Sequence, residues 1–291
     1  MSSAASFPFG EAAEPRPARR PGGPGSARCF VLGVYPSALH VQWRLPAWAH
    51  EKAGKSVIGS LAISDEPEVF WDGAGAERLV AEWKARVGFR DGDGPSQWGQ
   101  VFAAGNGTSG RPVRDHVLVP LGLDPVDVWF TDVVNTYFVK TGKGQQGAAV
   151  GLFNTVAPHM DLAEARLPAR PTPAELIKLA VQHHRERLRA ELVEASAPIV
   201  VTLGEEARSV LDCIADASDG EPSRPLTGAT ASADSYGGPG TVTIGGWTGR
   251  WFALVHPGNR AKQWRKLHAD WVELTKKARA RADAGSAESR D

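Results

Sequence analysis

Four short runs of apolar residues constrain the fold of this chain more than any other feature. The runs are rich in β-branched and aromatic side chains and cover residues 29–33, 128–134, 199–203 and 251–255. A strand that is apolar at nearly every position suits a parallel sheet covered on both faces. We therefore expect these runs to be the central strands of one sheet. Two weaker runs, 56–64 and 240–246, are predicted as edge or hairpin strands.

Amphipathic helices alternate with these runs. They are predicted over residues 76–88, 172–195, 205–217 and 261–278. At the start of the second helix, Thr172 is the expected N-cap, Pro173 fills the first helical position and Glu175 completes a capping box. Strands that alternate with helices imply parallel pairing. The fold class that follows is α/β, as a three-layer α/β/α sandwich with a central, mainly parallel four-stranded sheet.

Composition divides the chain into one folded domain and two tails. Residues 1–27 are rich in Pro, Gly, Ala and Arg and are expected to be disordered, as is the tail 279–291. The domain is predicted to cover residues 28–278. No apolar run approaches the roughly 20 residues that cross a bilayer. We therefore expect a cytoplasmic protein that has no membrane partner.

Charge and cysteine content exclude several classes of function. Lys and Arg together number 33, as do Asp and Glu, so any basic surface for nucleic acid must be local. Two cysteines, Cys29 and Cys213, are too few for an iron–sulfur cluster or a Cys-rich zinc site. No further ligand completes a metal pattern around His183 and His184, so we expect neither a metal nor a cofactor.

Polar segments follow three of the four predicted central strands. They cover residues 33–37, 132–135 and 256–260, whereas the strand 199–203 ends in the plain sequence LGEEA. Ligands of parallel sheets bind beyond the carboxyl ends of the strands, so the three segments predict a shared site.

The residues in these segments differ in what they offer a ligand. Gly33 and Pro36 let the backbone approach closely, and Ser37 supplies a hydroxyl group. His256 is a hydrogen-bond donor of tunable charge. Arg260 concentrates positive charge beside the start of the last helix, which suits an anion.

Four motifs in this order resemble the uracil-DNA glycosylase superfamily. That superfamily has a first strand followed by a Gly-x-x-Pro turn, a strand with the sequence TNVV, a strand and helix of the form IVALGxxAxxxL, and a last strand followed by HPS. The matching segments here are GVYPS, TDVV, VVTLGEEARSVL and HPG. They extend over about residues 29–275. The resemblance implies the three-layer fold and the removal of a base from DNA.

The resemblance also implies roles for the site residues. A glycosylase extrudes its target nucleotide into a pocket, where His256 would donate a hydrogen bond to the departing base. The turn would hold sugar and phosphate through Gly33, Tyr35, Pro36 and Ser37. The segment after the last strand is expected to press into the DNA through Pro257, Gly258, Asn259, Arg260 and Lys262.

An aromatic ring is also expected to stack on the extruded base. Phe102 is the predicted ring, because it precedes a Gly-rich segment similar to one in the superfamily. Phe70 and Trp71 are rival candidates. The partner is DNA, duplex or single-stranded, bound by a monomer.

Two departures from the family motifs shape the functional hypothesis. Active relatives carry an acidic group in the first turn, where this chain has Val34 and Tyr35. Asp132 replaces the asparagine that reads the base. An ionised carboxylate only accepts hydrogen bonds, so it suits an exocyclic amine such as that of cytosine. A protonated Asp132 would also assist departure of the base as a general acid.

The hypothesis is therefore a DNA N-glycosylase that removes cytosine, a modified cytosine such as those of foreign DNA, or another amino-bearing base. The candidates for activating water are Asn135, Asp65, Glu66 and Asp115.

Other interpretations stay open at the level of sequence. Asp132 is alternatively a structural carboxylate that binds backbone N–H groups at a strand end. His40, Trp264 and Trp271 are interpreted as structural residues. The whole protein is alternatively a catalytically silent nucleic-acid-binding module, or a hydrolase of free nucleosides or nucleotides. Such a hydrolase would lack the salt-dependent affinity for DNA that several phosphate contacts produce.

Overall fold

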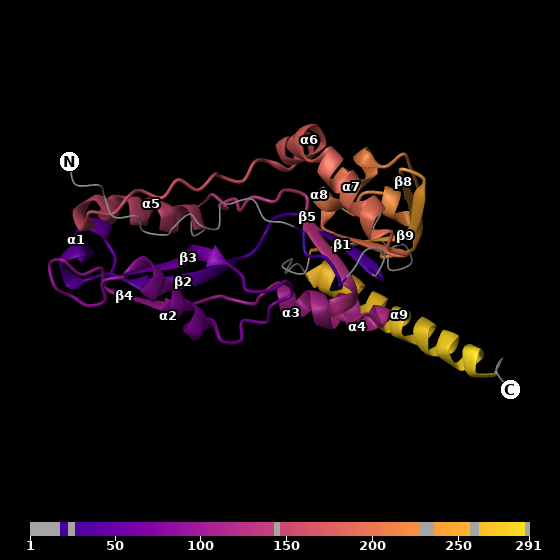
Figure 1. The fold of residues 1–291 in the computed structure, drawn as a ribbon, viewed down its shortest axis with the longest axis horizontal. Coiled ribbons are helices and arrows are strands. Elements are labelled where there is room, and N and C mark those ends of the chain that lie inside the picture. Colours follow the sequence, from indigo (N-terminus) through magenta and orange to yellow (C-terminus); the bar gives the residue numbers. More distant parts are fainter. Residues whose placement is uncertain (1–17, 23–26, 143–145, 227–235, 257–261, 289–291) are drawn as a thin grey trace. The chain divides into compact units, whose positions relative to one another are not determined.

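A computed structural model describes residues 18–22, 27–142, 146–226, 236–256 and 262–288 (Figure 1). The side chains of residues 262–264 and 282–288 lie outside this description. Contacts group the chain into two compact units. One, the six-stranded unit, contains the described residues within 17–36, 109–135 and 171–291; the other, the three-stranded unit, contains those within 37–108 and 136–170. The chain therefore passes between the units several times.

A mixed sheet forms the centre of the six-stranded unit. Its strands lie in the order β5 (Val128–Asp132), β1 (Cys29–Gly33), β6 (Ile199–Leu203), β9 (Trp247–Leu254), β8 (Gly240–Ile244) and β7 (Ala217–Gly220). The first four strands are parallel neighbours, and β8 and β7 extend the sheet in antiparallel pairing. The α/β class predicted from the sequence is confirmed. The sheet has six strands rather than the four that we expected.

Helices and turns of the six-stranded unit flank this sheet. They are α3 (Gly110–Val113), the π-helical turn η3 (Arg114–Leu118), α4 (Val119–Leu121), η4 (Pro125–Asp127), α6 (Pro173–His183), α7 (Arg185–Ala195), α8 (Glu205–Ile214), η6 (Glu221–Ser223) and α9 (Lys262–Glu288). In Figure 1, α7 and α8 lie on one side of β1 and β5, and α4 and α9 lie on the other. All five residues of β1 are buried, as a strand covered on both faces requires.

The predicted capping box begins α6. The Thr172 hydroxyl accepts from Glu175 N at 3.4 Å, and the Glu175 carboxylate accepts from Thr172 N at 2.9 Å. The single helix predicted over 172–195 is divided, because His184 has φ −119° and separates α6 from α7. The first turn of α6 therefore follows the local sequence signal, whereas the break at His184 does not.

The three-stranded unit contains an antiparallel sheet in the order β3 (Val57–Asp65), β2 (Ala38–Arg44) and β4 (Gln100–Ala103). Its helices are η2 (Ala47–Ala49), α1 (His50–Ala53), α2 (Ala76–Val87), α5 (Gln146–Val156) and η5 (Ala157–Met160). We predicted β3 and α2 but not β2 or β4. Along β2, buried Val41 and Trp43 alternate with exposed Gln42 and Arg44, so only one face of this sheet is covered.

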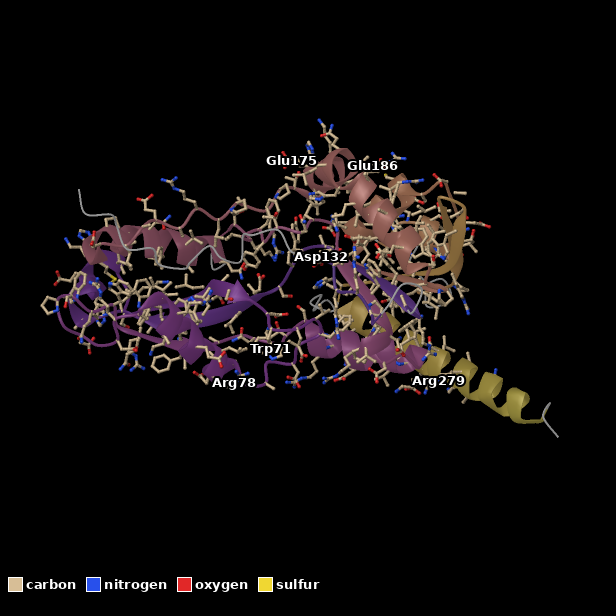
Figure 2. The ribbon with its side chains drawn as sticks, viewed as in Figure 1. Trp71, Arg78, Asp132, Glu175, Glu186 and Arg279 are labelled. Carbon is tan, nitrogen blue, oxygen red and sulfur yellow. The ribbon has the colours of Figure 1, made fainter. Side chains whose placement is uncertain are left out.

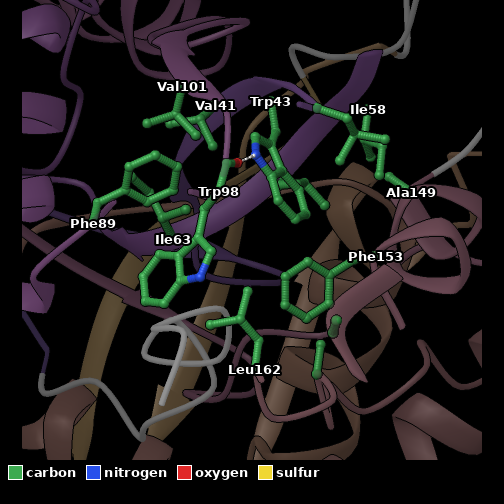
Figure 3. Packing of buried hydrophobic residues seen from close by; sticks show 14 of the residues in the cluster. Val41, Trp43, Ile58, Ile63, Phe89, Trp98, Val101, Ala149, Phe153 and Leu162 are labelled. Carbon is green, nitrogen blue, oxygen red and sulfur yellow. Dashed lines mark hydrogen bonds between the residues drawn. The ribbon is translucent and has the colours of Figure 1, made fainter. Parts of the chain in front are cut away.

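Aromatic side chains dominate the core of the three-stranded unit (Figure 3). Trp43 is fully buried, and its ring centroid lies 5.5 Å from that of Phe153 on α5. Its indole Nε1 donates to Trp98 O at 2.5 Å, while Trp98 Nε1 donates to Met160 O at 3.3 Å. Trp43 and Trp98 thus satisfy their indole N–H groups while filling the core.

Among the described helices, none is long and apolar enough to span a bilayer.

Candidate functional site

The turn after β1 and the segment after β5 run side by side at the carboxyl ends of the parallel strands. Gly33 pairs with Asp132 in the register of β1 and β5. The pairing continues beyond the strands, because Val133 N donates to Gly33 O at 3.0 Å and Val134 N donates to Val34 O at 3.3 Å. Two of the predicted polar segments are therefore held together by backbone hydrogen bonds.

The Asp132 side chain lies against Gly33. A Cβ atom at Gly33 would stand 2.2 Å from Asp132 Oδ1 and 3.2 Å from the Phe130 ring. Any side chain at position 33 would therefore displace the carboxylate, which is partly buried at the end of β5 (Figure 2). Gly33 is required here for space, because its φ lies outside the left-handed region.

Arg187 of α7 holds the backbone on which Asp132 sits. Its Nη2 donates to Asp132 O at 2.8 Å and to Val133 O at 3.0 Å. Its Nη1 donates to Thr131 Oγ1 at 2.9 Å and to the buried Glu191 carboxylate at 3.0 Å. The guanidinium thereby neutralises Glu191 and fixes the end of β5. We did not predict this clamp, because an Arg and a Glu four residues apart usually form an exposed helical pair.

His256 follows β9 and stands beside the end of β6. Gly204 N donates to Leu254 O at 2.7 Å, which joins the two strand ends. A Cβ atom at Gly204 would lie 3.5 Å from His256 Cβ and 3.7 Å from both Val34 Cγ2 and Glu206 Oε2. These three side chains therefore surround Gly204, whose φ of +101° favours glycine. His256 itself is exposed.

Glu206 is a member of this group that we did not predict. We expected residues 205 and 206 only to favour the start of a helix. Glu205 does have a structural role, since it accepts from Arg208 Nε at 2.9 Å and from Leu226 N at 2.7 Å. Glu206 is instead half-buried with its carboxylate on the Gly204 side. The end of β6 thus adds an acidic group to the site.

The other predicted site residues are distributed over both units. Half-buried Tyr35, buried Pro36 and partly buried Asn135 belong to the six-stranded unit, next to the segments described above. Ser37 and Phe102 belong to the three-stranded unit. The expected DNA contacts Pro257, Gly258, Asn259 and Arg260 lie outside the described residues, as does the side chain of Lys262.

Phe102 differs from its rivals in accessibility. Its side chain is 40% exposed on β4, and the Arg44 guanidinium lies over its ring, 5.4 Å from the centroid. Phe70 and Trp71 are 7% and 2% exposed, and Trp71 Nε1 donates to Ala74 O at 2.9 Å. Phe70 and Trp71 are therefore core residues, and Phe102 is the exposed ring of the three candidates.

The predicted candidates for activating water lie in different parts of the fold. Asp65 and Glu66 lie in the three-stranded unit. Asp115 lies in η3 and pairs with Arg114 at 3.0 Å. Of the four, Asn135 is the one that follows β5 and lies three residues after Asp132. Glu206, at the end of β6, is an additional candidate and carries the acidic group that Asn135 lacks.

His40 occupies a polar cluster inside the three-stranded unit. Its Nε2 lies 3.1 Å from the Tyr137 hydroxyl and 2.7 Å from Gln146 Nε2. Asn106 brackets its backbone, accepting from His40 N at 2.8 Å and donating to His40 O at 3.0 Å. Burial lowers the pKa of His40 to about 4, against an opposing hydrogen bond to the backbone of Ala38. The neutral ring fits a structural role.

The described residues contain no group of three side chains suited to holding a metal ion. The sequence matches no protein-family model and no curated protein. The resemblance to the uracil-DNA glycosylase superfamily therefore stays a prediction that rests on the four motifs.

Proposed function

We propose that this protein is a DNA glycosylase that hydrolyses the N-glycosidic bond of an extruded, amino-bearing base such as cytosine or a modified cytosine. The observation that carries the proposal is the Asp132 carboxylate against Gly33, at the sheet edge that also bears His256. The six-stranded unit would then be a divergent form of the three-layer glycosylase sandwich, with its parallel strands β5, β1, β6 and β9 as the family's central four.

Asp132 would determine which base is removed. A carboxylate accepts from the exocyclic amine of cytosine, whereas uracil presents a carbonyl oxygen at the same place. The Arg187 clamp supports this assignment, because it fixes the backbone of Asp132 through the carbonyl oxygen and leaves the carboxylate to face Gly33. A fixed acceptor discriminates between bases better than a mobile one.

His256 and Glu206 would divide the chemistry of bond cleavage. The electron pair of the C1′–N bond leaves with the base, and His256 donates a hydrogen bond to the negative charge that develops there. Water bonds to C1′, and its proton passes to Glu206. We assign this general-base role to Glu206 because its Oε2 lies on the same side of Gly204 as Val34, in the turn that lacks an acidic group. The freed base then takes a proton from solvent.

Excision assays on oligonucleotides test the proposal. Substrates carrying cytosine, 5-methylcytosine, 5-hydroxymethylcytosine or uracil are incubated with the protein, and abasic sites are detected by alkaline cleavage. We expect product from an amino-bearing base, and loss of product in His256→Asn and Glu206→Gln. Glu186→Gln, an exposed glutamate on α7, is the matched control and should retain activity.

Asp132→Asn provides the sharpest test, because the amide has the shape of the carboxylate but also donates. We expect this variant to lose the amino-bearing base and to gain uracil. Strong excision of uracil that survives Asp132→Ala would refute the role of Asp132.

A second candidate function is a nucleic-acid-binding module without catalysis. Buried, apolar Val34 in the turn favours it, because this position supplies no group that activates water. Binding to DNA without an abasic product across all the substrates would select the module. A hydrolase of free nucleosides would instead release base from nucleosides and show no salt-dependent affinity for DNA.

A further inference from the structure

A cavity of about 480 Å³ lies beside His256 in the six-stranded unit. It opens between η3 and the first half of α9, and its floor includes Val255 and Val272, which are 8% exposed. We call it the α9 pocket. Its volume falls in the range of about 300–1,000 Å³ that is typical of small-ligand sites.

Hydrogen bonds fix one wall of the α9 pocket. His268 Nε2 lies 2.9 Å from His116 O, a carbonyl that can only accept, so Nε2 carries the proton. The other ring nitrogen, Nδ1, therefore accepts from the Tyr236 hydroxyl at 2.8 Å, and that hydroxyl accepts from Val255 N at 3.2 Å. The His268 ring also stacks on Trp271, with centroids 5.4 Å apart. This wall is set before any ligand binds.

The rim of the α9 pocket is cationic. Arg265 and Lys276 both line it, and the acidic residue Glu273 stands between them on α9. Lys276 Nζ lies 3.9 Å from Glu273 Oε1 in a pair whose side chains are 47% and 64% exposed. Such a long, exposed pair holds its partners weakly, so Lys276 is free to turn toward an anion.

An apolar floor, flat imidazole walls and a cationic rim together suit a ligand with a planar body and a phosphate group. Arginine binds phosphate in a forked geometry, and lysine binds it as a point charge. The ring of exposed His116 lies edge-on to His268, with centroids 6.5 Å apart, and adds a further flat surface. A nucleotide has both of the required parts.

We propose that the α9 pocket binds one nucleotide of a DNA strand, next to the base held at His256, with the phosphate between Arg265 and Lys276. The identification of that strand as DNA rests on the proposed glycosylase function, whereas nucleotide binding rests on the pocket alone. The pocket would hold the neighbour of the extruded nucleotide, so an unmodified strand should already bind there.

Binding assays with matched variants test this assignment. A fluorescent single-stranded oligothymidylate is titrated with full-length protein, and anisotropy is followed. We expect Arg265→Gln and Lys276→Gln each to weaken binding by about tenfold, the size of one phosphate contact. Glu273→Gln should tighten binding several-fold. The controls are Lys266→Gln and Lys277→Gln, exposed neighbours that do not line the pocket, and they should change binding by less than about twofold.

A second measurement locates the ligand. Thymidine 5′-monophosphate should shift the imidazole NMR signals of His116 and His268, and thymidine without phosphate should shift them much less. Equal losses of affinity in the lining and control variants, or no shift of these NMR signals, would contradict nucleotide binding in the α9 pocket. Shifts with the free nucleotide but no binding of oligothymidylate would overturn the assignment to a DNA strand.

Excision gives an independent readout. Absence of excision together with retained, pocket-dependent binding would overturn the proposed function alone. If Arg265→Gln and Lys276→Gln change neither excision nor binding, nucleotide binding in the α9 pocket is contradicted and the proposed function is not.

Discussion

Substitution of Gly33 by alanine tests the central contact of the candidate site. The new Cβ would stand 2.2 Å from Asp132 Oδ1, well inside van der Waals contact, so the carboxylate or the strand must move. The strand has little freedom, because every residue of β1 is buried between β5 and β6. Overpacking at such positions costs about 1–3 kcal/mol. We expect Gly33→Ala to lower the free energy of unfolding by about 2 kcal/mol.

Two comparisons isolate the cause of that loss. Gly59→Ala, on β3, is the matched control, because a Cβ there meets no atom within 4 Å. It should be neutral or stabilising by up to about 1 kcal/mol, since alanine restricts the unfolded chain. In an Asp132→Ala background the clashing oxygen is gone, so Gly33→Ala should cost at least about 1 kcal/mol less than in the parent protein.

The measurement is urea unfolding followed by circular dichroism, with midpoints compared at constant slope. Hydrogen exchange at the amides of β1 and β3 assigns each change to its own unit. An equal cost of Gly33→Ala with and without the Asp132 carboxylate would refute the contact, and with it the geometry on which the proposed base preference rests.

Three further predictions test the elements around the site. Arg187→Ala should lower the free energy of unfolding by about 3 kcal/mol, because it leaves the buried Glu191 carboxylate unpaired; the exposed control Arg78→Ala (Figure 2) should change the same urea midpoint by less than about 0.5 kcal/mol. Thr172→Ala removes the capping box of α6 and should cost about 1 kcal/mol in the same assay, and no change would show that the cap is not formed. The pKa of His40 falls from 6.5 to about 4 on folding, so between these two pH values the unfolded chain binds more protons than the folded protein. Stability should therefore decrease by up to about 3 kcal/mol as the pH drops through it, and an NMR titration of His40 with a midpoint near its ordinary value would contradict this.

The parallel part of the sheet was predictable because its signal is local. Each of β5, β1, β6 and β9 contains a run of at least three consecutive apolar residues, and such a run has few alternatives to a strand covered on both faces. The capping box is equally local, since all its atoms lie within four consecutive residues. The strands and their order also predicted which edge of the sheet would carry the candidate site, because the carboxyl ends of parallel strands meet at one edge.

The strands that we missed depend on partners distant in sequence. β7 has the sequence ASDG, in which no residue is buried, and it forms through backbone pairing with β8. β2 and β4 alternate between buried and exposed residues over short lengths, a pattern that is weaker than a continuous run. Their pairing joins residues on either side of α2, which no local pattern reveals.

The roles of individual charges were hidden for a different reason. Glu205 and Glu206 are the same residue type at consecutive positions, so the sequence does not distinguish their roles. A helix, however, turns successive side chains by about 100°. That rotation directs Glu205 to Arg208 and Leu226, and Glu206 to the Gly204 side of the site. Only the position of α8 relative to β6 decides which glutamate faces the sheet edge.

Gly33 and Gly204 shape the site for separate physical reasons, and the difference bears on the chemistry of Asp132. Position 204 requires glycine because its backbone has φ +101°. Position 33 requires glycine because the Asp132 carboxylate occupies the space that a side chain would need. Asparagine has the same shape as aspartate, so the space over Gly33 would accept either residue equally well. Packing therefore does not select the acid at position 132, and the choice must rest on charge and hydrogen bonding. For that reason, we expect Asp132→Asn to change the preferred base of the proposed glycosylase without disturbing the contact that Gly33→Ala would remove.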